Sequence, residues 1–342
     1  MPMPMTLLML ALLSLAEGAG AAPLLEKGEK LFREGNVTGA LAAFDEAAKV
    51  DPKDARPHYL KGVALEKKGD NAGATAAYKQ AIKLKSDFPE AHNNLGALLL
   101  AKNDLPGAQG EFEAAVKAKP AYAEAQYNLG VARDGLGKKE EAVAAYKEAV
   151  RLKPGDAGYR MNLGAALRRT GDVNGALVAL KEATRLAPRD AIAWANLGMV
   201  LSDSKSYDEA NSALEKATKL KPDFALAWNR LGRVALKRGE IVPAVAAQEK
   251  ARKLEPKNGA IAADLCRALI EQKQAPRAVA ECKAAVDLEP KNPLAHYELM
   301  KALVAKGDCG AAKTANASFK ALPVKPEAKQ QADAILATCN KK

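Results

Sequence analysis

The sequence has few of the residues that build most metal and catalytic sites. Only three histidines stand in 342 residues, and all four cysteines lie in the last quarter of the chain. No two cysteines are two to four positions apart, and no histidine lies near them at a ligand spacing, so we expect no metal site. No segment reads as a strand followed by a glycine-rich phosphate loop. We therefore expect no cofactor and no enzyme activity.

Aromatic residues are also scarce, at 5% of the chain, although hydrophobic residues make up 48%. This indicates a core of small aliphatic side chains. Residues 6–16 form an uncharged apolar run, TLLMLALLSLA, which is too short to span a bilayer, since a membrane helix needs about 20 residues. The small-residue sequence Ala19-Gly20-Ala21 follows. The sequence thus predicts a signal peptide at residues 1–21 and no transmembrane segment in the mature chain; a frayed apolar tail is the alternative.

The sequence does contain a repeat of 34 residues. Glycine recurs at this interval, and alanine recurs at the same interval in a second register. The glycines are Gly28, Gly62, Gly96, Gly130, Gly164, Gly198 and Gly232, and the alanines are Ala40, Ala74, Ala108, Ala142, Ala176, Ala210, Ala244 and Ala278. A further alanine and a proline repeat in the same phase. Chance does not explain four such registers, so the chain is an array of one unit.

Each unit is predicted to be two helices joined by a turn. In residues 191–224 the apolar positions of the first helix follow the spacing i, i+3, i+4, i+7. Proline at 222 ends the second helix, because it lacks the N–H that would continue it. A glycine inside a helix costs about 1 kcal/mol relative to alanine. We expect close packing of the two helices at Gly198 to offset that cost.

This pattern resembles the tetratricopeptide repeat (TPR) family. The resemblance rests on the 34-residue period and on Trp194, Leu197, Gly198, Leu201, Ala210, Leu214, Ala217 and Pro222. It implies an all-α, right-handed α-solenoid of antiparallel helix pairs. About nine units are expected within residues 22–324, the last one degenerate because Met300 replaces the glycine. Residues 325–342 are expected to form a C-terminal capping helix and tail.

The cysteines occupy informative places in this register. An even number in an exported protein indicates disulfides, and four cysteines allow three pairings. Cys266 replaces the first-helix glycine of its unit and Cys282 stands at the second-helix aromatic position, so we favour a bridge between them. The remaining bridge would join Cys309, at the turn of the last unit, to Cys339. Buried free thiols are the alternative.

The formal net charge of +11 has a local explanation. Basic residues recur near the ends of the second helices, where cations suit the helix dipole. They are Lys49, Lys83, Lys117, Arg151, Arg185, Lys219 and Lys253. No aromatic residues interleave with them as a surface for single strands would require, so we expect no nucleic-acid partner.

One face of each first helix remains for binding, and asparagine recurs on it. In the TPR family the first helices line a concave surface that binds extended peptides or other proteins. Asn94, Asn128, Asn162 and Asn196 are expected to point away from the glycine–alanine seam. Since an amide both donates and accepts hydrogen bonds, such a row could bond the backbone of a peptide. The alternative is that asparagine is merely common at this repeat position.

The predicted protein-binding residues extend this row. They are Asn93, Asn94, Asn128, Asn162, Asn196, Met199, Asn229, Arg230, Arg233 and Lys237. The three basic residues could receive a carboxylate; a solvated charged face is the alternative. Some relatives clamp a C-terminal carboxylate with a lysine–asparagine set, but Ala97 and Gly158 occupy positions where that set needs polar groups. A binder of C-terminal tails is therefore disfavoured.

These observations favour a non-catalytic scaffold or adaptor, exported to a bacterial periplasm or secreted. It would bind an extended protein segment in the concave groove, in the assembly of a cell-envelope complex. Two alternatives stay open. The chain could be an accessory subunit of an envelope enzyme or secretion machine that docks by its convex face, or it could bind an anionic glycan through its basic surface.

Overall fold

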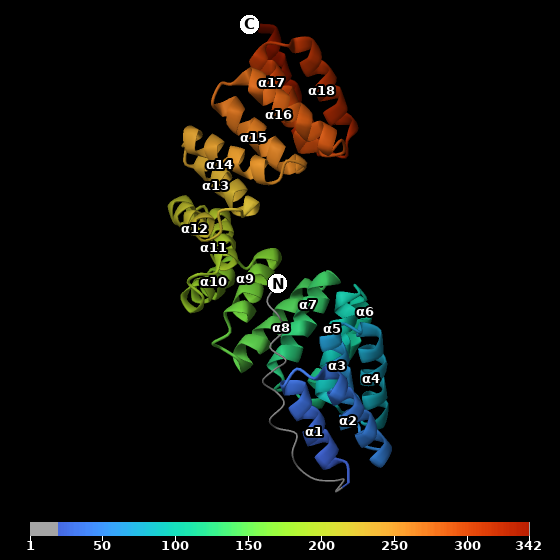
Figure 1. The fold of residues 1–342 in the computed structure, drawn as a ribbon. Helices are drawn as coiled ribbons and strands as arrows, with labels where there is room; N and C mark the ends of the chain where they lie inside the picture. Colours follow the sequence, from blue (N-terminus) through green and yellow to red (C-terminus); the bar gives the residue numbers. More distant parts are fainter. Residues whose placement is uncertain (1–19, 342) are drawn as a thin grey trace. The chain divides into compact units, whose positions relative to one another are not determined.

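The structure is a computed structural model that describes residues 20–341 (Figure 1). Helices and turns account for these residues, and no strand occurs among them, which confirms the expected all-α class. The predicted signal peptide lies almost wholly outside the described residues. Its last residue, Ala21, is buried and accepts backbone hydrogen bonds from Leu24 and Leu25 at the start of the first helix.

The helices alternate in two sets, as the repeat predicts. The first helices of the pairs are α1 (Ala22–Arg33), α3 (Arg56–Lys68), α5 (Pro89–Ala101), α7 (Ala123–Gly135), α9 (Ala157–Thr170), α11 (Ala191–Asp203), α13 (Ala225–Lys237), α15 (Gly259–Glu271) and α17 (Pro293–Lys306).

The second helices complete the pairs, and one further helix follows them. The second helices are α2 (Val37–Val50), α4 (Asn71–Leu84), α6 (Leu105–Ala118), α8 (Lys139–Leu152), α10 (Val173–Leu186), α12 (Tyr207–Leu220), α14 (Ile241–Leu254), α16 (Ala275–Leu288) and α18 (Cys309–Ala321). Helix α19 (Pro326–Ala337) comes next, and a short 3₁₀ turn, η2 (Thr338–Lys341), ends the described chain.

The chain divides into two compact units, and the division falls inside α9. Unit 1 ends at Tyr159 and unit 2 begins at Arg160. Within unit 1, second helices also pack against the next first helix, as α4 does against α5 and α6 against α7. Within unit 2, α10, α12, α14 and α16 pack in the same way against α11, α13, α15 and α17. These second helices therefore bury one side against the first helix of their own pair and another side against the first helix of the next pair.

The repeated glycines lie where two helices of one pair approach closely. A Cβ added at Gly96 would stand 2.7 Å from the ring of Phe112, and one added at Gly130 would stand 2.7 Å from Tyr146. Gly198 meets Leu214 at 2.6 Å in the same way. Any side chain here would force the helices apart, which costs about 1–3 kcal/mol in a packed core. The expected close packing at the glycines is confirmed.

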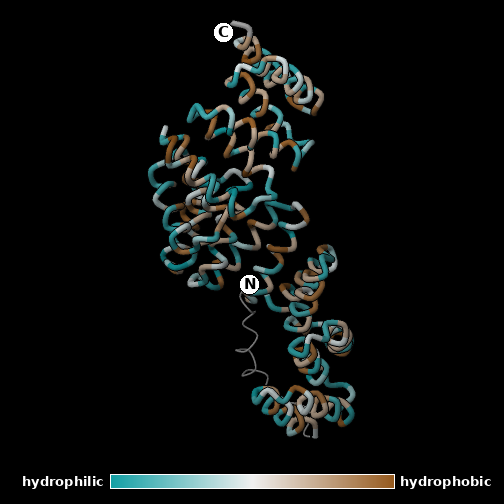
Figure 2. Tube along the Cα trace, turned by 45° about the horizontal axis from the view of Figure 1, so that its top comes forward, coloured by the Kyte–Doolittle hydropathy of each residue, from teal (hydrophilic) through white to brown (hydrophobic). Residues whose placement is uncertain are grey.

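Hydrophobic and polar residues are interspersed along the described chain (Figure 2). The buried side chains are mostly alanine and leucine, with a single large ring in several pairs, as in Tyr78, Phe112 and Tyr146. Small alanines let the helices pack closely, and the large ring fills the space over the glycine.

In one helix pair of unit 2, α15 and α16, a disulfide is found at the position of this contact. Cys266 on α15 is joined to Cys282 on α16, with Cα atoms 5.4 Å apart, and both side chains are fully buried. Cys309, at the start of α18, is joined to Cys339 beyond α19, with a Cα separation of 5.7 Å. These are the two bridges that the repeat register favours. The second one ties the terminal helix to the last pair.

Candidate functional site

Most of the predicted binding residues fall on two faces, one within each unit. In unit 1 they lie on α5 and α7, which contact each other. We call this the α5–α7 face; it carries Glu90, Asn93 and Asn94 on α5 and Glu124 and Asn128 on α7.

The asparagines of the α5–α7 face are bonded to one another and to buried rings. The amide of Asn94 donates to the hydroxyl of Tyr78 at 3.2 Å, and that hydroxyl donates in turn to a carboxylate oxygen of Glu66. The amide of Asn128 donates to the Asn93 side-chain oxygen at 3.0 Å. The Asn93 amide reaches Glu124 at 3.4 Å.

Burial accompanies this bonding. Asn94 is only 8% exposed and Asn93 only 1%. Burial raises the pKa of the Glu124 carboxyl, and the hydrogen bond from Asn93 opposes that shift. The expectation that the asparagines point away from the packed seam is therefore wrong for Asn94, because the hydroxyl of Tyr78 draws its amide inward.

The predicted residues of unit 2 lie mainly on α11 and α13, which are also in contact. We call this the α11–α13 face. It consists of Ile192, Asn196 and Met199 on α11 and Leu226, Arg230, Arg233 and Lys237 on α13. Successive members are three or four residues apart, so they share one side of each helix.

The α11–α13 face differs from its counterpart in unit 1 in its exposed side chains and in the bonding of its asparagine. Ile192 is 46% exposed and Leu226 is 40% exposed. The equivalent residues in unit 1 are Glu90, which pairs with Lys119 at 3.2 Å, and Glu124. Asn196 makes no side-chain hydrogen bond within the described chain. Apolar side chains and an unused amide thus lie side by side on one surface.

The internal partners of Asn94 and Asn128 stand at two fixed distances along the chain. The bonds of unit 1 reach back either 16 residues, from Asn94 to Tyr78, or 35 residues, from Asn128 to Asn93. For Asn196 those positions hold Leu180 and Met161, whose side chains contain no oxygen or nitrogen. For Arg230, the next residue of the row, they hold Leu214 and Ala195.

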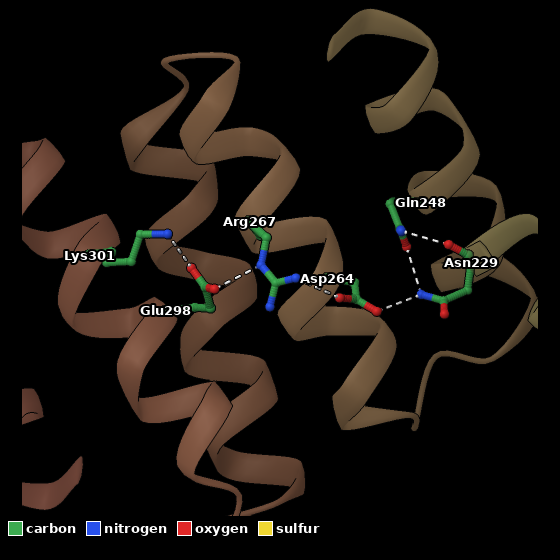
Figure 3. Close-up of polar contacts among 6 residues, drawn as sticks. All are labelled: Asn229, Gln248, Asp264, Arg267, Glu298 and Lys301. Carbon is green, nitrogen blue, oxygen red and sulfur yellow. Dashed lines mark hydrogen bonds and ion pairs between the residues drawn. The ribbon is translucent and has the colours of Figure 1, made fainter. Parts of the chain in front are cut away.

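The row continues beyond Arg230 in a buried polar network (Figure 3). Asp264 accepts a hydrogen bond at 2.9 Å from Asn229, which stands 35 residues earlier, and Asn229 also bonds Gln248. Arg267 reaches Asp264 at 3.6 Å and donates to Glu298 at 2.8 Å. Lys301 completes the network on Glu298 at 3.0 Å.

Asn229 belongs to this network rather than to the exposed face. It is 6% exposed, and its amide nitrogen donates to both Gln248 and Asp264. Its equivalent in unit 1, four repeats earlier, is Asn93, which is buried and bonded in a similar way. Asn162 lies on α9 and is not free either. Among the predicted asparagines, only Asn196 keeps an unused amide.

Within residues 20–341 no group of histidine, cysteine and carboxylate side chains could hold a metal ion. Over the same residues, none of the helices has both the length and the apolar character needed to cross a membrane.

The chain belongs to the tetratricopeptide repeat family. A family model described as "Tetratricopeptide repeat" matches residues 93–157, 161–210 and 197–259. A second, described as "TPR repeat", matches residues 28–69 and 65–103. Proteins of this family generally mediate contacts between proteins. A search of curated proteins gave no match.

Solved structures with this fold include YrrB, "a TPR protein with an unusual peptide-binding site". It is 27% identical, with a TM-score of 0.51, and the match covers 54% of this chain and 95% of YrrB. The Cut9–Hcn1 assembly of the APC/C has a TM-score of 0.59 at 19% identity, covering 82% of this chain and 55% of that one. PilF of Pseudomonas aeruginosa has a TM-score of 0.54 at 17% identity, covering 60% and 94%. The last two likenesses concern the fold alone.

Proposed function

We propose that this protein is a non-catalytic scaffold that binds an extended segment of a partner protein on the α11–α13 face. The observation that carries the proposal is the combination of exposed Ile192 and Leu226 with the unused amide of Asn196. Extended segments need donors and acceptors for their backbone and apolar contacts for alternate side chains. This face offers both on two adjacent helices.

Two further points support the proposal. YrrB, which is similar to about half of this chain, is described by its peptide-binding site. At the positions equivalent to Ile192, Asn196 and Leu226, the α5–α7 face has a charged or an internally bonded side chain, so a partner has less to gain there.

We further propose that the protein works in the bacterial cell envelope after export, in the assembly of a complex. The support is the apolar leader with its small-residue site and the two disulfides, which persist in oxidising compartments. Fractionation of cells that make the full chain would test this. Recovery from the cytosol with an uncleaved leader would contradict it.

Site-specific photo-crosslinking tests the binding face directly. A photoreactive amino acid is placed singly at Ile192 or Leu226, and in controls at Val178 on α10 or Val242 on α14, which are 71% and 68% exposed. In an envelope extract we expect one shared crosslinked product from the first two positions only. A product from the valines alone would favour docking by the second helices, as an accessory subunit would.

The dependence of binding on salt concentration distinguishes the proposal from the remaining alternative, a protein that binds an anionic glycan. Binding of an anionic glycan through scattered basic residues should weaken steeply as ionic strength rises, since exposed charges are screened beyond about 8 Å at physiological salt. A segment held mainly by apolar contacts and an amide should keep most of its crosslinks at raised salt.

A further inference from the structure

Arg230 is a half-buried cation that has no hydrogen-bond or ion-pair partner within residues 20–341. Its Nε is inaccessible to solvent and makes no hydrogen bond within the described chain, and no carboxylate forms an ion pair with its guanidinium. Burial lowers the pKa of Arg230, and the nearby charges of Arg233 and Arg168 add to that effect. A desolvated guanidinium with an unused donor is costly unless a ligand completes it.

The carboxylates that influence Arg230 are engaged elsewhere. Asp264 accepts from Asn229 at 2.9 Å and lies 3.6 Å from Arg267 (Figure 3). Asp203 accepts from Arg168 at 2.5 Å. Neither forms a hydrogen bond or an ion pair with Arg230.

Two other arginines on the first helices of unit 2 have carboxylate partners. Arg168 on α9 has Asp203, and Arg267 on α15 has the buried Glu298 at 2.8 Å. Arg233 and Lys237, which share the exposed side of α13 with Arg230, form no ion pair in the part of the chain that the structure describes. The α13 side of the face therefore carries uncompensated positive charge next to exposed Leu226.

We infer that Arg230 receives the carboxylate of an aspartate or glutamate side chain within the bound segment, beside an apolar residue that contacts Ile192 and Leu226. This inference rests on the proposed function and gives the chemistry of the partner. A guanidinium can hold a carboxylate through two parallel hydrogen bonds. The unused amide of Asn196, one repeat earlier, is available for the backbone of the same segment.

Peptide pools test the inference on the full mature chain. The probes are nine-residue randomised pools, acetylated and amidated at their ends, with glutamate, glutamine or lysine fixed at the centre. We expect the glutamate pool to bind about tenfold more tightly than the glutamine pool, as a charge-assisted hydrogen bond predicts. Arg230→Gln should reduce this preference to less than twofold.

Matched variants control for charge and folding. Arg277→Gln removes the same charge from α16, where Arg277 pairs with Glu249 at 2.5 Å, and should leave the preference intact. Arg230→Lys keeps the charge without the two-pronged geometry and should retain part of the preference. Circular dichroism would establish that each variant is folded.

The outcomes separate this inference from the proposed function. Equal binding of the glutamate and glutamine pools by the wild type, or a preference that survives Arg230→Gln, would overturn the inference and leave peptide binding standing. A pool with central glutamine and a free C-terminus that binds better than the glutamate pool would assign the site to a terminal carboxylate instead. Failure of every pool, together with no crosslink at Ile192 or Leu226, would overturn the proposed function itself.

Discussion

The α5–α7 and α11–α13 faces are built from the same repeat positions but differ in how their polar groups are satisfied. In unit 1, Asn94 is bonded to Tyr78 and Asn128 to Asn93. In unit 2, Asn196 keeps an unused amide and stands among exposed apolar side chains. The asparagine itself is therefore not what distinguishes the proposed binding face. The difference lies in its neighbours 16 and 35 residues earlier, which provide a polar partner for Asn94 and Asn128 but not for Asn196.

The largest effect is expected at the α15–α16 contact of unit 2, where a disulfide stands in place of the glycine and the large side chain that meet in earlier pairs. Cys266→Ala with Cys282→Ala should destabilise unit 2 by about 3 kcal/mol, because a bridge across 16 residues restricts the unfolded chain. Both tryptophans, Trp194 and Trp228, lie in unit 2, so fluorescence during urea unfolding reports on this unit.

A second variant sharpens that comparison. Cys266→Gly with Cys282→Tyr rebuilds the contact that Gly130 and Tyr146 make in unit 1. We expect it to unfold at a higher urea concentration than the double alanine variant. If it is the less stable of the two, the disulfide and the ring are not interchangeable solutions of the same packing problem.

The next effect concerns the internal bonds of unit 1. Tyr78→Phe removes the hydroxyl that bonds Asn94 and Glu66, and it should cost about 2 kcal/mol because buried polar groups lose their partner. Tyr297→Phe on α17 is the control, since that hydroxyl makes no hydrogen bond in the described chain, and it should cost less than about 0.5 kcal/mol. Thermal unfolding followed by circular dichroism compares the two; equal losses would show that the Asn94 bond adds nothing.

A smaller effect should follow from giving Asn196 an internal partner. Met161→Asn places an amide 35 residues before Asn196, as Asn93 stands before Asn128. We expect binding of the glutamate pool to weaken about threefold to tenfold, since the Asn196 amide would then be engaged. Met161→Leu, which offers no polar group, should leave binding unchanged. Loss of binding in both variants would point to packing rather than to the amide.

The smallest effect is a pH dependence confined to unit 1. Both ring nitrogens of His92 face acceptors, the Glu111 carboxylate at 2.6 Å and the Ser86 carbonyl at 2.9 Å. The hydrogen bond to Glu111 raises the pKa of His92, although burial opposes it. The protonated ring is thus favoured in the folded state, and its stabilisation is complete below the unfolded pKa of about 6.5 and is lost as pH rises through the folded pKa.

His92→Gln measures this contribution. We expect the variant to be less stable than the wild type by about 1 kcal/mol at pH 5.5, with the difference shrinking at pH 9. Urea unfolding followed by circular dichroism gives both values. A difference that grows with pH would show that the neutral imidazole is the favoured form.

Much of the fold could be predicted from the sequence because it depends on local spacing. The 34-residue period places each helix, and the separation of 16 residues between Gly96 and Phe112, or between Cys266 and Cys282, marks the contact within each pair. The division of the chain inside α9 left no sign in the repeat pattern. Gln248 stands in the sequence where several other pairs have a ring, but only the structure shows that Asn229 bonds it as part of a buried polar network.

The candidate site was harder to predict, since the asparagine row looks uniform along the sequence. The internal bond of Asn94 depends on the hydroxyl of Tyr78 in the preceding 34-residue repeat, and that of Asn128 depends on Asn93. Reading positions 16 and 35 residues before each member of the row would have separated Asn196 and Arg230 from the others. That signal was present in the sequence, but only the structure shows which neighbours the side chains reach.

The most direct test of the central claim compares two double variants in capture from an envelope extract. One is Asn94→Ala with Asn128→Ala on the α5–α7 face, and the other is Asn196→Ala with Arg230→Gln on the α11–α13 face, each shown to be folded. We predict that the first retains the partner that crosslinks to Ile192 and that the second loses it. Loss of that partner by the first variant and retention by the second would contradict the account.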